Sequence, residues 1–153
     1  LYPPFVKMSE YAPNGTLGSA DERRNVYAIW ADPATGTHVL RWLTDFPPLG
    51  ADNALEPRAV QVGPDKYAIL FSVLNGAGYR MEYRLIDSAG TVLGSASFPG
   101  AFFCAASNPI LLGDKLHWLG IEPDSWPGPV PAHLYGMDVS DPMRPSLLVG
   151  AAS

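Results

Sequence analysis

The stretch DKYAIL at residues 65–70 gives the first indication of the fold, because similar stretches occur at two other places along the chain. They are NVYAIW at 25–30 and DKLHWL at 114–119, and each passes from a polar turn into apolar and aromatic residues. Residues of these kinds favour strands, and short apolar runs bounded by turns are typical of buried ones. We therefore predict a repeat that is built of strands.

A second recurring segment follows each of these stretches and ends in an aspartate, at Asp45, Asp87 and Asp138. A turn follows each aspartate, and a carboxylate in this position accepts hydrogen bonds from backbone N–H groups. The aspartates come 20, 22 and 24 residues after the start of the preceding stretch. Because two independent markers agree, we interpret the pattern as a true repeat whose inner loop lengthens along the chain.

Further strands are predicted around the second and third pairs of markers, at 56–63, 91–98, 107–113 and 145–150. Each unit then contains four antiparallel strands in roughly 40 to 50 residues, which is the size of a propeller blade. The predicted fold class is therefore all-β, with about three four-stranded antiparallel units.

Length and composition fit one domain with a real core, since 47% of the 153 residues are hydrophobic and only 16% are charged. No apolar run approaches the length of a membrane span, so we expect no membrane insertion. We expect an irregular N-terminal arm, which could add a strand to a neighbouring chain, and then one repeat domain. The arm covers 1–20 and the domain 21–153, with units at 21–52, 53–102 and 103–153.

The charge of the chain argues against nucleic-acid binding. The formal net charge is −5 and the ten lysines and arginines are scattered, whereas phosphate-backbone contacts need clustered positive charge. The single cysteine, Cys104, allows no intrachain disulfide, and its apolar surroundings in the sequence predict a buried, inert thiol.

The sequence PILLGDKLHW at 109–118, followed by LYGMD at 134–138, resembles a blade of kelch-like and related β-propellers. The resemblance covers about residues 20–150 and implies the fold and general role of such a protein, with no site residue carried over. The paired glycines of kelch blades and the Trp-Asp dipeptide of WD repeats are missing.

Three blades are too few for a closed propeller, which usually has four to eight. The resemblance thus implies a partial propeller, an assembly of copies, or a larger parent chain. The alternative is a β-trefoil, whose three four-stranded units in about 150 residues match the count. The Gln-x-Trp motif of ricin-type lectin trefoils is absent.

No catalytic motif stands out. His38, His117 and His133 lack the H-x-H or H-x-x-x-H spacing that suggests a metal site. The strand-ending aspartates belong to separate units, so turn capping is predicted for them rather than acid–base chemistry. The chain has no nucleophile elbow, phosphate loop or dinucleotide fingerprint. We expect no catalytic residue, no metal and no cofactor, and a protein that is not an enzyme.

The long loop at 120–131 is rich in proline and contains Trp126 outside any strand pattern. Proline reduces the entropy lost on ordering, and an exposed tryptophan can anchor a protein or stack on a sugar. We predict that Trp126, Asp124 and Tyr135 contact a partner; the alternative is that Trp126 folds over the edge of a blade. The sequon at Asn14 predicts an N-glycan and an extracellular chain.

Together these features predict a non-enzymatic interaction or structural module, extracellular or at the cell surface. It would present loops to a protein or a glycan, or assemble into a homo-oligomer or a larger chain. Two alternatives stay open. One is a carbohydrate-binding, trefoil-like lectin, and the other is part of a propeller-type hydrolase whose catalytic groups lie elsewhere.

Overall fold

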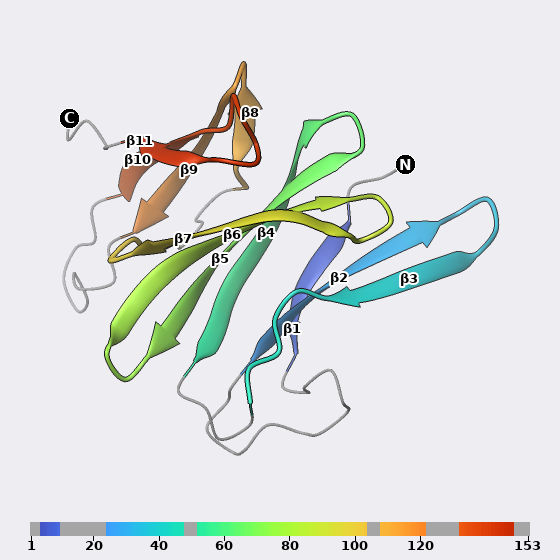
Figure 1. Ribbon diagram of the computed structural model, residues 1–153, viewed down its shortest axis with the longest axis horizontal. Helices are drawn as coiled ribbons and strands as arrows, with labels where there is room; N and C mark the ends of the chain where they lie inside the picture. Colours follow the sequence, from blue (N-terminus) through green and yellow to red (C-terminus); the bar gives the residue numbers. More distant parts are fainter. Residues whose placement is uncertain (1–3, 10–23, 48–51, 104–107, 122–131, 149–153) are drawn as a thin grey trace.

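The computed structural model describes residues 4–9, 24–47, 52–103, 108–121 and 132–148. Its strands form three antiparallel sheets of three, four and four strands, which we name the N-terminal, central and C-terminal sheets (Figure 1). The all-β prediction is confirmed. The predictions made for Asn14, Cys104, Asp124 and Trp126 lie outside the described residues.

The N-terminal sheet contains β1 (Phe5–Ser9), β2 (Asn25–Asp32) and β3 (Thr37–Trp42), in that order. Strand β1 falls in the segment for which an irregular arm was predicted, and it pairs antiparallel with β2. The reason is burial, because Val6 opposes Ala28 and packs against the core. In its described residues this sheet has three strands, one fewer than predicted.

The central sheet confirms the predicted four-stranded unit. It runs in the order β4-β5-β6-β7 and consists of β4 (Asn53–Gly63), β5 (Lys66–Asn75), β6 (Gly78–Asp87) and β7 (Val92–Pro99). Seven consecutive residues of β5, 67–73, are buried. A run that is buried on both faces of a strand shows that both faces of this sheet are covered.

The C-terminal sheet repeats this plan. It contains β8 (Ile110–Leu112), β9 (Lys115–Ile121), β10 (Ala132–Asp138) and β11 (Ser146–Leu148), in the order β11-β10-β9-β8. Lys115 opposes Asp138 here just as Lys66 opposes Asp87 in the central sheet. These two pairs fix which positions of the two sheets are equivalent.

The predicted turn caps are confirmed at two of the three aspartates, whereas β3 ends at Trp42 and Asp45 therefore does not end a strand. The Asp87 carboxylate accepts hydrogen bonds from the backbone N–H groups of Ala89 and Thr91, at 2.9 and 2.8 Å. The Asp138 carboxylate accepts one from the N–H of Ser140 at 2.9 Å. Hydrogen bonds from the side chain and backbone of Ser140 lower the pKa of Asp138, since they stabilise the charged form.

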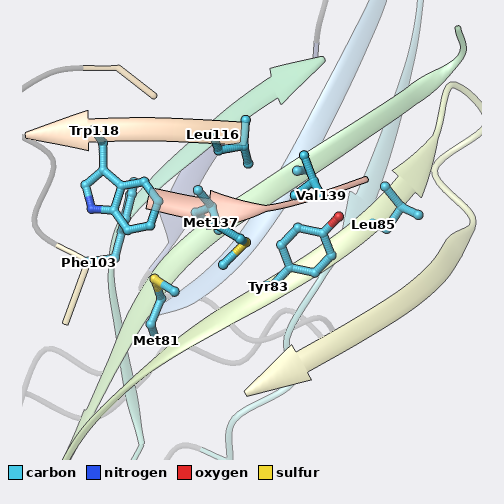
Figure 2. Packing of buried hydrophobic residues seen from close by; sticks show 10 residues of the cluster. Met81, Tyr83, Leu85, Phe103, Leu116, Trp118, Met137 and Val139 are labelled. Carbon is cyan, nitrogen blue, oxygen red and sulfur yellow. The ribbon is translucent and has the colours of Figure 1, made fainter. Parts of the chain in front are cut away.

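Two hydrophobic clusters hold the three sheets together. The first joins the N-terminal and central sheets through residues such as Val26, Trp30, Tyr67, Ile69 and Phe71. The second joins the central and C-terminal sheets, and Figure 2 shows side chains of both sheets meeting there; its members include Leu70, Met81, Tyr83, Leu116, Trp118 and Met137. The central sheet therefore lies between the other two.

The sheets stack in the same sense along the chain. One residue after the paired lysine, Tyr67 of the central sheet faces the N-terminal sheet, and the equivalent Leu116 faces the central sheet. The edge strands also lie side by side, since β1 contacts β4 and β4 contacts β8. Among the described strands, the three sheets remain separate and no closed barrel or ring is formed.

Candidate interaction surface

The C-terminal sheet has one face against the central sheet and one face turned away from it. Side chains alternate along a strand, so the burial of Leu116 and Trp118 in the second cluster turns His117 and Leu119 to the other side. We call this side the outer C-terminal face. Its apolar members on the four strands are Ile110, Leu112, Leu119, Leu134 and Leu148, and the same register places His117, Lys115 and Asp138 on this face.

The large apolar side chains of this face are exposed. The exposed fractions are 54% for Ile110, 60% for Leu112, 43% for Leu119 and 61% for Leu134. These four are half of the exposed large hydrophobic residues among those described. Gathered apolar side chains on a surface usually mark a site of interaction.

The cross-strand pairing makes the face continuous. Leu119 lies opposite Leu134, and Ile110 lies opposite His117. Leu148 lies opposite Gly136, where a Cβ atom, if one were present, would come within 2.9 Å of the Leu148 Cδ1 atom. The missing side chain at Gly136 thus leaves room for Leu148 on this face.

The equivalent face of the central sheet is buried at its centre. Ala68 and Leu70 occupy the positions of His117 and Leu119, two and four residues after the paired lysine, and neither is exposed to solvent. Both pack in the second cluster, beneath the C-terminal sheet. The position that is covered in one sheet is therefore open in the next.

Contacts with the turn of the following sheet repeat as well. Four residues before the strand-ending aspartate, the Tyr83 hydroxyl donates a hydrogen bond to the Pro142 carbonyl in the β10–β11 turn, at 2.8 Å. The N-terminal sheet makes a related contact, because Arg41 packs against Gly90 in the β6–β7 turn. Leu134 holds the position of Tyr83 in the C-terminal sheet, and its side chain is exposed.

The opposite end of the stack also presents apolar side chains. We call the side of the N-terminal sheet that faces away from the central sheet the outer N-terminal face. The rings of Tyr27 and Trp42 lie opposite each other there, with centroids 5.3 Å apart. Ile29 and Leu40 form the next pair, and Leu40 is exposed.

The central sheet carries an ionic network on the face toward the N-terminal sheet. The buried Glu82 carboxylate accepts hydrogen bonds from Arg80 at 2.6 Å and from Arg84 at 2.8 Å. Arg80 also binds Asp52 at 2.8 Å, and Arg84 lies over the Phe71 ring. The hydrogen bond from Arg80 lowers the pKa of Asp52, and the same bond raises the pKa of Arg80.

These charges balance one another. Two carboxylates meet two guanidinium groups, and the Ser97 hydroxyl also donates to Glu82 at 3.0 Å. Hydrogen bonds between ionised partners of this kind are among the strong ones in proteins. The network therefore suits a structural role better than proton transfer.

Of the three residues predicted to contact a partner, the structure describes Tyr135. Its ring stacks on Trp118 with the centroids 5.9 Å apart, and it packs against the second cluster. His133 lies beside Tyr135, at 6.3 Å between ring centroids, while His117 and His38 lie on other faces or strands. The described residues contain no group of three or more His, Cys, Asp or Glu that could hold a metal ion.

Sequence reasoning missed the outer C-terminal face. A signal was present, since Ile110, Leu112, Leu119 and Leu134 all occupy positions that alternate with core residues of the same strands. The assignment of these strands to a blade did not predict whether another sheet would cover the face that points away from the central sheet.

Comparisons with protein-family models, with curated proteins and with solved structures found no match to this chain. The resemblance to kelch-like propellers therefore remains an expectation, and it identifies no family. Separately, within the ranges that the structure describes, no helix is long and apolar enough to cross a membrane.

Proposed function

We propose that this chain is a non-enzymatic interaction module made of propeller-like sheets, which binds protein surfaces through the ends of its stack. One observation carries the proposal: the outer C-terminal face exposes four large aliphatic side chains, and two of them, Leu119 and Leu134, hold positions that the central sheet buries. At about 25 cal/mol per Å² of apolar surface, covering such a face stabilises a complex substantially.

The hydrogen bonds of the polar groups inside the central sheet also support this role. The buried carboxylate of Glu82 is satisfied by two guanidinium groups, and Tyr83 is held by its bond to Pro142, with burial raising the pKa of its hydroxyl. A carboxylate and a hydroxyl whose hydrogen bonds are made within the protein stabilise a rigid scaffold. A location outside the cell and contacts through the loop around Trp126 belong to the same proposal and rest on the sequence.

The test is an array of immobilised extracellular proteins, glycans and copies of this chain, probed with the labelled chain at a concentration too low for self-association in solution. Three variants accompany the wild type: Leu134→Glu on the outer face, Trp126→Ala in the long loop, and Val92→Glu as a control. Val92 is also an exposed apolar residue, but it lies on β7 of the central sheet. We expect specific protein binding that Leu134→Glu abolishes and Val92→Glu preserves.

Other results would change the proposal in defined ways. Glycan binding that is lost in Trp126→Ala and kept in Leu134→Glu would support a lectin instead. Turnover on a panel of hydrolase substrates, without specific binding to the array, would overturn the non-enzymatic role.

A further inference from the structure

We propose that the outer C-terminal face of one copy docks on the outer N-terminal face of a second copy, so that two chains associate head to tail. This inference rests on the proposed function, because it takes the outer C-terminal face to be an interaction surface and specifies its partner. It commits to a second copy of this chain as the occupant.

The first argument is continuity with the contacts inside the chain. The N-terminal sheet meets the central sheet, and the central sheet meets the C-terminal sheet, each time through the same pair of faces. The outer C-terminal face is the next face in this series, since Leu119 and Leu134 occupy the positions of Leu70 and Tyr83. The stack would continue if a further sheet packed there with the kind of face that each sheet turns toward the preceding one.

The outer N-terminal face is such a face, since it is the side of its sheet that would meet a preceding sheet. In each sheet, the face toward the preceding one carries two aromatic rings, Tyr67 and Phe71 in the central sheet and Trp118 and Tyr135 in the C-terminal sheet. The outer N-terminal face has the same orientation in the series and carries the paired rings of Tyr27 and Trp42. The outer N-terminal face can therefore pack on the aliphatic outer C-terminal face of another copy in the same way as neighbouring sheets pack inside one chain.

The number of sheets provides the second argument. The described residues of one chain form three sheets, so two copies supply six, which lies within the range of about four to eight at which propellers close. A head-to-tail pair that closes contains two identical interfaces and leaves neither outer face exposed. Pairing of the C-terminal face with itself would leave Tyr27, Trp42 and Leu40 uncovered.

The experiment measures the mass of the purified chain by light scattering and sedimentation over a wide range of concentration. The expected mass is twice the 16.4 kDa of the chain. Leu134→Glu places a negative charge on one interacting face and Leu40→Lys places a positive charge on the other, so each variant alone should return to the mass of one chain. Val92→Glu should keep the mass of the wild type. Circular dichroism and a thermal scan verify that each variant is folded.

Mixing the two variants gives the sharpest result. In a head-to-tail pair of one Leu134→Glu chain and one Leu40→Lys chain, one interface is wild type and the other carries both opposite charges. We therefore expect the mixture to regain the mass of two chains. A pair formed through two C-terminal faces would instead survive Leu40→Lys and would gain nothing from mixing.

The outcomes separate this inference from the proposed function. A wild-type chain that stays monomeric, or a dimer that resists Leu40→Lys, overturns head-to-tail docking. If the monomer still binds array proteins in a way that depends on Leu134, the proposed function stands and only the second copy as partner is wrong. If it neither associates nor binds, both proposals fail. A series of masses beyond two chains supports the docking and overturns closure at two copies.

Discussion

The central and C-terminal sheets share one strand plan, but the same position has different surroundings in the two. Leu70 is fully buried between sheets, and its equivalent Leu119 is 43% exposed. The residue type is the same, so the difference comes from the presence or absence of a neighbouring sheet. The apolar pattern of a strand thus indicates that a neighbouring sheet can pack against it. Whether such a sheet is present is seen only from the burial of its side chains.

Truncating these two leucines should give the largest contrast. Leu70→Ala leaves a cavity in the second cluster and should lower the free energy of unfolding by about 2–5 kcal/mol. Leu119→Ala removes a partly exposed side chain and should cost less than about 1 kcal/mol in the monomeric protein. Urea unfolding of both variants, in a background that carries Leu134→Glu, measures the difference. Equal losses would show that the two faces are covered alike.

A pair of glycines tests the contact between sheets next. Gly90 and Gly113 both have positive φ values, 79° and 61°. A Cβ atom at Gly90 would overlap the Cγ atom of Arg41, whereas nothing lies within 4 Å at Gly113. We expect Gly90→Ala to cost about 2–4 kcal/mol and Gly113→Ala about 1–2 kcal/mol, because both strain the backbone and only the first forces packed groups apart. Thermal unfolding of the two variants decides this, and a larger loss for Gly113→Ala would contradict it.

The tyrosine that joins the central sheet to the next turn should have a smaller effect. Tyr83→Phe removes the hydrogen bond to the Pro142 carbonyl and should cost about 1 kcal/mol. Leu134→Tyr places a hydroxyl at the equivalent position of the C-terminal sheet, and we expect a change within about 0.5 kcal/mol. Chemical denaturation compares the two, and an unchanged midpoint for Tyr83→Phe would show that the bond contributes nothing.

Acid should weaken the central sheet through Asp52. Its pKa is lowered from 3.8 in the fold, chiefly by the hydrogen bond from Arg80. The stabilisation is therefore fully present above about pH 4 and is lost as the pH falls through the lowered pKa, because the folded state must then take up a proton that it resists. Asp52→Asn should be less stable than the wild type at neutral pH, and this difference should shrink in acid. Denaturation at several pH values tests this, and a gap that does not narrow would contradict it.

Most strands could be predicted from the sequence, because alternation and turn chemistry act locally. The two series of markers placed the strands of the central and C-terminal sheets, and Asp87 and Asp138 cap turns as expected. Strand β1 was missed because its five residues precede the first of the repeated stretches and belong to neither series of markers. Its pairing depends on β2, which is distant in sequence.

The candidate site was harder to predict than the fold. The sequence drew attention to Trp126, an unusual residue in an unusual loop, which lies outside the described residues. The outer C-terminal face consists of ordinary leucines and isoleucines, and such residues are identical in sequence whether a neighbour covers them or not. Leu134 differs from the equivalent, buried Tyr83 because the C-terminal sheet lies at the end of the stack, and this is seen only in the structure.

The position of the central sheet between two clusters has a consequence for how the molecule opens. Amides of β5 can exchange with solvent only after contacts on both faces are lost, whereas the C-terminal sheet can detach after losing one. Hydrogen exchange should therefore be slowest in β5 and faster in β9 and β10, in the order expected when a stack of sheets frays from its ends. In a ring without ends, this gradient would level out.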